Sequence, residues 1–222
     1  AKPHLGAVAG CLSDDDSDVR AAACDTLGKH GEAAEQYLDA ISDCVKDAEP
    51  RVQIAARVAL QKHGKVGEGD AEASAQYLEH KDWETRRAAC HAIGSLGQAA
   101  VPHLAAVAKC LSDRETAPRG EDVGRHVRAA ACEALGKHGE AAEPHLGGVA
   151  KLLQDSDAKV RAAAYKALTT HIEARGQAVV AEVEATKGED VWGLAHKLLD
   201  EIGQVADTMA QTSGSTGEEP QT

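Results

Sequence analysis

The chain has 222 residues and a formal net charge of −12, with no Phe, two Trp and three Tyr. A core so poor in aromatic side chains must be packed from Ala, Val and Leu at close range, which argues against a β-sandwich or a doubly wound sheet. The acidic balance argues against sequence-independent nucleic-acid binding, because a phosphate backbone favours clustered Lys and Arg. No run reaches the ~18 apolar residues of a membrane span, so an integral membrane protein is not expected.

The cysteines are spaced as in helices and not as in a disulfide framework. They form no CxxC pair and stand at positions 11, 24, 44, 90, 110 and 132. This pattern predicts reduced thiols in an intracellular, reducing compartment, with cytoplasm and organelle both open. The start at Ala1 fits either a chain from which upstream sequence was removed or a part of a longer protein.

The first regular stretch of the chain recurs further along it. Residues 19–47 read VRAAACDTLGKHGEAAEQYLDAISDCVKD, and residues 127–155 read VRAAACEALGKHGEAAEPHLGGVAKLLQD. The shared VRAAAC and LGKHGEAAE segments exceed what helical composition alone would give. The chain is therefore predicted to be a repeat array.

Each repeat is predicted to hold two helices. Apolar or small residues follow Val127 at offsets of 3, 4, 7, 8 and 11, which is one face of a 3.6-residue period. Gly136 and Gly139 interrupt this pattern, and Pro144 fits the first turn of the next helix. Because a hairpin with one narrow apolar stripe per helix cannot bury itself alone, the hairpins are expected to stack into an all-α solenoid.

The repeats can be aligned on the residue that precedes the recurring Arg, which we call the anchor. Its six positions are Val19, Val52, Thr85, Val127, Val160 and Val191. The predicted array covers residues 1–203 as six hairpins, at about 1–31, 34–64, 70–97, 100–139, 142–174 and 176–203. Residues 204–222 are expected to form a helix end and a flexible tail.

Three places depart from the regular repeat. Hairpin three has a weak first helix, because Gly67 and Gly69 interrupt its start. The anchors before and after 113–126 are 42 residues apart where 33 is usual, which predicts a protruding loop and a second candidate contact site. Hairpin six carries Trp192 in the place of the recurring Arg, as expected of a capping repeat.

The runs DSDVRAAACDTLG at 16–28 and DAKVRAAAYKALT at 157–169 resemble HEAT repeats, especially the short HEAT-like variety found in phycobilisome lyases. The resemblance covers nearly all of residues 1–203 and implies a superhelix of about six HEAT-like hairpins. In such repeats an Asp and an Arg form a ladder between neighbouring hairpins. The resemblance thus implies structural roles for Arg20, Arg86, Arg128, Arg161, Asp16, Asp82 and Asp157. Gln53 and Trp192 break the Arg series, so we expect an interruption at units two and six.

No constellation in the sequence predicts catalysis, a metal site or a cofactor. One repeated position holds His in four units, but Leu96 in unit three, which favours a packing role. Side chains one repeat apart, roughly 10 Å for stacked helices, are too distant to share one ion. Di-iron hydroxylases of the HEAT class would need His-Glu dipeptides, and here no His is followed by Glu. We therefore expect a protein that is not an enzyme.

Two further repeat positions are candidates for partner binding. The position five residues after the anchor holds Cys, Arg, Tyr and His in different repeats, which suggests surface and not core. The position two residues after the anchor flanks it, and its mostly small side chains would let a partner approach closely. We predict that they line a concave face that binds partners, through Ala21, Cys24, Ile54, Arg57, Arg87, Cys90, Ala129, Cys132, Tyr165 and His196. A merely solvated helix surface is the alternative.

Together these patterns predict a non-enzymatic protein-binding scaffold, or a structural subunit of a larger multiprotein assembly. The alternative, implied by the resemblance to phycobilisome lyases, is a bilin lyase-like chromophore-handling subunit of a photosynthetic antenna pathway. Bound pigment or metal after purification would favour the alternative. A stable complex with other proteins would favour the scaffold.

Overall fold

The computed structural model describes residues 2–65 and 69–185, and within these ranges the regular elements are helices. The residues outside helices there include one isolated β-bridge, between Thr116 and Asp122. The predicted all-α fold is therefore confirmed.

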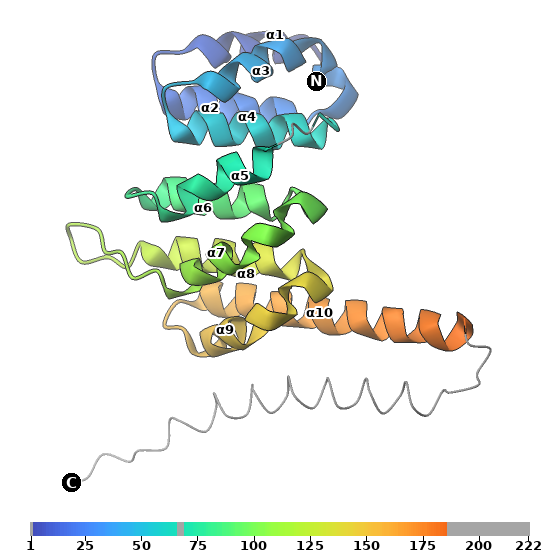
Figure 1. Cartoon of the computed structure of the whole chain (residues 1–222). Helices are drawn as coiled ribbons and strands as arrows, with labels where there is room; N and C mark the ends of the chain where they lie inside the picture. Colours follow the sequence, from blue (N-terminus) through green and yellow to red (C-terminus); the bar gives the residue numbers. More distant parts are fainter. Residues whose placement is uncertain (1, 66–68, 186–222) are drawn as a thin grey trace. The chain divides into compact units, whose positions relative to one another are not determined.

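The α-helices follow one another as first and second helices of successive hairpins. They are α1 (Lys2–Gly10), α2 (Ser17–Gly28), α3 (Leu38–Asp43), α4 (Pro50–Lys62), α5 (Asp70–Ala75), α6 (Trp83–Ile93), α7 (Leu104–Lys109), α8 (Gly124–Gly136), α9 (Leu146–Lys151) and α10 (Ala158–Ala185) (Figure 1). Odd numbers mark first helices and even numbers mark second helices.

Short 3-10 helices complete the hairpins. Three of them lead into first helices, namely η2 (Gly31–Tyr37), η5 (Gly97–His103) and η7 (Gly139–His145). The others extend first helices at their ends, namely η1 (Cys11–Ser13), η3 (Cys44–Lys46), η4 (Gln76–Glu79), η6 (Cys110–Ser112) and η8 (Leu152–Gln154). Pro144 lies inside η7, so the predicted link GEAAEP is itself helical.

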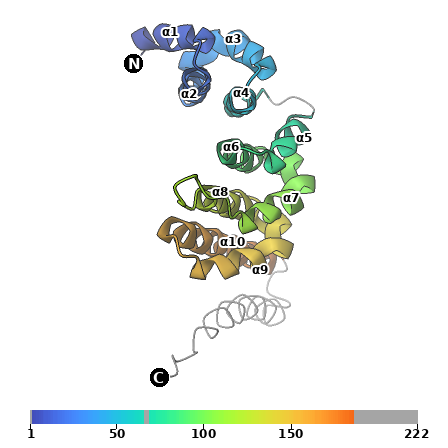
Figure 2. The same ribbon diagram turned by 90° about the vertical axis from the view of Figure 1, so that its left-hand side faces the viewer.

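The chain divides into two compact units, 1–110 and 111–222. In the first unit α2 packs against α4 and α4 against α6, while α3 and α5 pack on α4 and α6 respectively (Figure 2). In the second unit α8 and α9 both pack against α10. Each second helix thus contacts a second helix of a neighbouring hairpin, as a stacked repeat requires.

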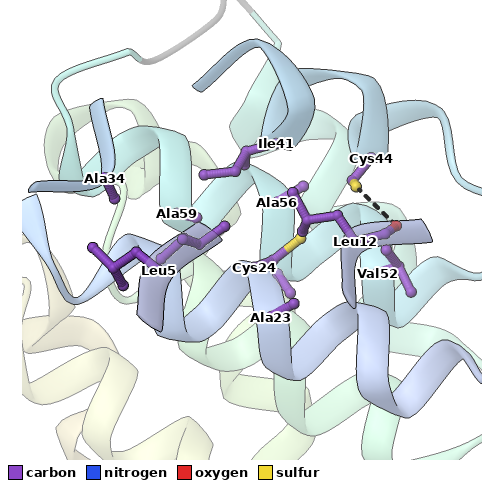
Figure 3. Close-up of a cluster of buried hydrophobic side chains, with 12 residues drawn as sticks. Leu5, Leu12, Ala23, Cys24, Ala34, Ile41, Cys44, Val52, Ala56 and Ala59 are labelled. Carbon is purple, nitrogen blue, oxygen red and sulfur yellow. Dashed lines mark hydrogen bonds between the residues drawn. The ribbon is translucent and has the colours of Figure 1, made fainter. Parts of the chain in front are cut away.

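The core of the first two hairpins is shared between them (Figure 3). Leu5 and Leu12 of hairpin one lie in one buried cluster with Ile41 and Cys44 of hairpin two. The Cys44 thiol also donates to the Leu12 carbonyl oxygen, at 3.9 Å between sulfur and oxygen. Small and aliphatic side chains fill this core, as the composition predicts.

One predicted hairpin boundary is wrong. Helix α10 runs from Ala158 to Ala185 without a break, although hairpin five was expected to end at 174 and hairpin six to begin at 176. Gly176 stands at that boundary. It does not end the helix, because Gly inside a helix costs only about 1 kcal/mol relative to Ala. The rest of hairpin six and the predicted tail lie outside the described residues.

Candidate protein-binding surface

The second helices of the first unit share one side with charged and polar residues that are exposed or half-buried, which we call the second-helix surface. Its members stand one residue before, six after or ten after their anchors, on the side of each helix opposite to the buried stripe. They are Asp18, Asp25, Arg51, Lys62, Glu84 and His91. This surface differs from the set of residues predicted from the sequence.

An ion-paired row fixes part of the second-helix surface. The Arg51 guanidinium lies 2.8 Å from an Asp18 carboxylate oxygen and 2.5 Å from a Glu84 carboxylate oxygen. These three residues come from α2, α4 and α6, so the row spans three successive hairpins. The sequence carries a signal of this row, because residues of alternating charge recur at a spacing of 33, but the row was not predicted.

In three repeats the position five residues after the anchor belongs to the core, so the predicted surface location of Cys24, Cys90 and Cys132 is wrong. Cys24, Cys90 and Cys132 have no exposed side-chain surface. In hairpin one this position faces the first helix of the next hairpin, since Cys24 packs in the cluster that contains Ile41 and Cys44 (Figure 3). Small Cys side chains fit this contact between hairpins.

Burial also makes these thiols poor nucleophiles. It is the largest factor that raises the pKa of Cys24 far above its ordinary value, and it raises the pKa of Cys132 to about 12. The thiolate is the reactive form of cysteine, so thiols with raised pKa values in buried surroundings are inert.

The other predicted members of the concave face differ in their exposure to solvent. Ile54 is buried, with 1% of its surface exposed, so its predicted surface location is also wrong. Ala21 and Ala129 are half-buried, and Tyr165 is exposed at 61%. His196 lies outside the described residues.

The two arginines expected to form a basic spot are engaged within the molecule. Nε of Arg57 lies 3.5 Å from a carboxylate oxygen of Asp70, and the Arg57 side chain is largely buried. The Arg87 guanidinium carbon lies 5.6 Å from the ring centroid of Trp83, in a cation–π contact. Charge reversal at Arg57 would therefore disturb packing and is a poor test of partner binding.

The Arg–Asp ladder exists, but its predicted Asp partners are wrong. Arg20 pairs with Asp47, with 2.8 Å between Nε and a carboxylate oxygen, and the acceptor belongs to the next hairpin. The predicted partner Asp16 instead caps α2, where its carboxylate accepts from the backbone N–H of Asp18. The short carboxylate nearest to a helix start satisfies free N–H groups there, so the ladder takes an Asp two residues earlier in the repeat.

The remaining predicted ladder residues follow the same division of roles. Asp82 and Asp157 accept from the backbone N–H groups at the starts of α6 and α10. Arg86 and Arg161 each donate to two backbone carbonyl oxygens of the turn that precedes their helix.

Arg128 is the most deeply buried member of the Arg series, with 1% of its surface exposed. It donates to both carboxylate oxygens of Asp155, at 2.8 and 2.9 Å, and to both of Asp122, at 2.8 and 3.2 Å. It also donates to the backbone carbonyl oxygen of Asp113. These bonds fasten both ends of the predicted loop 113–126 to α8, so the loop is anchored at its base. Its role as a contact site stays a prediction.

At hairpin two the expected interruption of the ladder has a clear replacement. Gln53 stands in the place of Arg and accepts a hydrogen bond from the Tyr77 hydroxyl at 2.8 Å. His80 stands in the place of the acceptor Asp of the next hairpin. The neutral pair of Gln53 and Tyr77 therefore joins hairpins two and three. Trp192, at the other expected interruption, lies outside the described residues.

The repeated histidines make backbone contacts between hairpins or within a helix. Nε2 of His63 lies 3.4 Å from the Leu27 carbonyl oxygen near the end of α2, and Nδ1 of His30 lies 2.8 Å from the Thr26 carbonyl oxygen. Among the residues that the structure describes, no three His, Cys, Asp or Glu side chains gather as a metal site would require. No helix in the same part of the chain combines the length and apolarity needed to cross a membrane.

A family model of HEAT repeats matches residues 5–75, which form hairpins one and two and α5. The resemblance to HEAT repeats is confirmed. The repeats of this chain are accordingly HEAT-like, with a core of aliphatic and small side chains and an Arg–Asp ladder. No curated protein matches the sequence.

Solved structures of helical repeat proteins resemble the chain over most of its length. The complex of CpcE and CpcF of phycocyanin lyase from Nostoc sp. PCC7120 is 22% identical, with a TM-score of 0.53, and the match covers 90% of this chain and 76% of that chain. A designed armadillo repeat protein is 17% identical with a TM-score of 0.52, covering 94% and 99%. An engineered protein is 18% identical with a TM-score of 0.52, covering 98% and 99%. At these identities the likeness shows the fold, and it confirms an α-solenoid.

Proposed function

We propose that the chain is a non-enzymatic scaffold, or a structural subunit of a larger assembly, that binds other proteins along the second-helix surface. The row formed by Asp18, Arg51 and Glu84 supports this proposal, because its ion pairs hold charges at set positions across three hairpins. A partner that follows the stack can make many weak contacts to such a row without deep burial of any single residue.

The test is cross-linking mass spectrometry of the complex that the tagged full-length chain forms in its native source. The second-helix variant is Asp25→Arg with Lys62→Glu, which exchanges two exposed charges and keeps the net charge. We expect the wild type to carry a stable partner with cross-links to α2 and α4. We expect the variant to lose most of that partner while its helix content, measured by circular dichroism, is unchanged.

A matched control exchanges charges elsewhere on the same unit. Asp43→Arg with Lys81→Glu also changes two exposed residues of opposite charge, outside the second-helix surface. This control should retain the partner. Equal partner recovery with both double variants, or a wild-type chain that purifies without any protein partner, would contradict the proposal.

The bilin lyase-like alternative stays a prediction with its own measurement. The likeness to the phycocyanin lyase complex supports a shared fold and says nothing about shared chemistry at 22% identity. A visible absorption band in the purified native complex that follows this chain through fractionation would favour the alternative.

A further inference from the structure

Three positions of each second helix face the next hairpin, at one, five and nine residues after the anchor. In hairpin one these positions hold Arg20, Cys24 and Gly28. In hairpin four they hold Arg128, Cys132 and Gly136. Hairpin two instead holds Gln53, Arg57 and Gln61. The junction between hairpins two and three therefore differs from the other two junctions at all three positions.

The close approach of neighbouring second helices is lost at this junction. A Cβ atom on Gly28 would lie 2.8 Å from Cα of Ala59, so hairpins one and two meet where no side chain fits. The residues equivalent to Gly28 and Ala59 are Gln61 of α4 and Ala92 of α6. Because Gln61 carries a full side chain, α4 and α6 do not share this close contact.

Buried polar groups at the same junction lack hydrogen-bond partners. The Ser74 hydroxyl and Nη1 of Arg57 are both buried without a partner among the described residues. Arg57 stands in the place of Cys24, and Ser74 stands in the place of Ile41. Cys24 and Ile41 are members of the apolar cluster that joins hairpins one and two (Figure 3). Unsatisfied buried polar groups raise the free energy of the folded state, so the junction between hairpins two and three is the weaker of the two.

The apolar contact across this junction is also reduced. Leu5 and Leu12 of hairpin one are buried, but the equivalent Leu38 and Val45 of hairpin two are only half-buried. Helix α5 supplies less cover, because it has Ala71 where α3 has Leu38. Less apolar surface is therefore removed from water between hairpins two and three, and the contact is correspondingly less favourable.

The contacts that remain are concentrated between the second helices. Arg51 of α4 lies 2.5 Å from Glu84 of α6, and both side chains are about one third exposed, at 33% and 34%. Exposed ion pairs of this kind stabilise a fold only weakly. Helix α5 itself is joined to α4 by the ion pair of Asp70 with Arg57, at 3.5 Å between a carboxylate oxygen and Nε.

We propose that the junction between hairpins two and three is a hinge, at which α5 separates from hairpin two while the pair of Arg51 and Glu84 keeps the second helices together. Local opening takes place where buried contacts are least favourable, and a stacked array is held together only by contacts between neighbours. Such a hinge lets the hairpins on its two sides adjust separately to a bound partner. The hinge goes beyond the proposed function and can be tested without any partner.

Hydrogen exchange of the full-length chain, followed by mass spectrometry, measures the opening. Helices α3 and α5 form a matched pair, because both are first helices of six residues. We expect peptides that cover α5 to exchange at least about tenfold faster than peptides that cover α3. Equal protection of the two helices would overturn the proposal.

A reciprocal exchange of ladder residues distinguishes hinge opening from fraying of α5 alone. Gln53→Arg with His80→Asp brings the ladder to this junction and should slow exchange in α5 at least about threefold, because a charge-assisted pair then resists opening. Neither residue lies on α5. Arg20→Gln with Asp47→His brings the neutral residues to the junction between hairpins one and two and should speed exchange in α3. Exchange in α5 that ignores the first pair of changes would show local fraying and would overturn the hinge.

Thiol labelling gives a second measurement that does not depend on the ladder variants. Ser74→Cys is close to isosteric and places a thiol at the hinge, while the native Cys24 and Cys132 are fully buried at other junctions. A buried thiol reacts only when its surroundings open, so N-ethylmaleimide should modify the thiol of Ser74→Cys at least about tenfold faster than Cys24 or Cys132. Equal labelling rates at the three positions would contradict a hinge at this junction.

Discussion

Gly28 and Gly136 occupy the same repeat position, at the ends of α2 and α8, and each faces an Ala of the next second helix. A Cβ atom on Gly28 would lie 2.8 Å from Cα of Ala59, and one on Gly136 would lie 2.9 Å from Cα of Ala167. Real Cβ atoms essentially never come this close to backbone. The absence of a side chain therefore sets how closely neighbouring second helices approach, beyond the helix-end preference that the sequence indicates.

We expect Gly28→Ala and Gly136→Ala each to lower the free energy of unfolding by about 1–3 kcal/mol, as overpacking does in tight cores. This loss should appear although Ala is the better helix former by about 1 kcal/mol. Urea denaturation followed by circular dichroism measures it. Gly10→Ala and Gly147→Ala are the controls, because nothing lies within 4 Å of the added Cβ. Controls that lose as much stability as the test variants would refute the close-approach argument.

The burial of a single residue could be predicted where the periodicity of its own helix determines it. It could not be predicted where a residue on a second helix determines it. The apolar stripe that begins at Val127 follows from the period of α8 alone. The burial of Arg57 depends on Asp70, which stands on another helix and replaces the Tyr37 or His103 of other repeats. A polar residue in the core becomes understandable only when its partner is known. A single sequence does not show which residues are paired across hairpins.

The ladder links neighbouring hairpins, and its interruption can be repaired. Gln53 already donates to the Asp47 carbonyl oxygen at 2.7 Å, as Arg20 donates to that of Asp14. His80 accepts from the backbone N–H of Asp82. Asp47 does the same for the N–H two residues after it, so an Asp in place of His80 would keep this bond.

We therefore expect Gln53→Arg and His80→Asp to stabilise each other. Combined, they should form between hairpins two and three the same contact that Arg20 and Asp47 form between hairpins one and two. We expect a favourable coupling of about 1 kcal/mol in a double-mutant cycle. Thermal or urea unfolding of the four proteins measures the coupling. Gln53→Lys with His80→Asp should show a smaller coupling, since Lys lacks the planar fork that binds a carboxylate through two bonds. Strictly additive effects in the Arg series would contradict the repeat register proposed for the ladder.

The elements themselves were predictable to different degrees. The second helices α2, α4, α6 and α8 follow from the 3.6-residue period, because each must bury a stripe. The first helices are shorter than their hairpins suggest, since 3-10 segments such as η7 take up the residues around Pro144. The ladder acceptors were misassigned because sequence proximity favours Asp16, which is used for helix capping.

At the scale of the whole molecule, acid should act on the chain in two opposing ways. Protonation of carboxylates relieves the repulsion of a chain with a net charge of −12, which favours the folded state. Protonation also breaks the bonds of the ladder. The Arg20 guanidinium holds the pKa of Asp47 below its ordinary value, and for Asp155 burial raises the pKa but hydrogen bonds from Arg128 outweigh it, so the net shift is also downward.

The direction of these shifts sets the pH window. A carboxylate whose pKa is lower in the folded state contributes stability that is fully present above the unfolded pKa and is lost as pH falls through the folded pKa. With an ordinary value of 3.8 for Asp, the ladder contribution should be constant from pH 7 to about pH 5 and decline below about pH 4. Asp155→Asn should be less stable than wild type at neutral pH, and this difference should shrink as the pH falls towards 2. Thermal unfolding from pH 7 to pH 2 measures it, with the exposed Asp43→Asn as a control for net charge. A gap between wild type and Asp155→Asn that stays constant down to pH 2 would contradict the argument, because the ladder would then contribute nothing that depends on the ionised carboxylate.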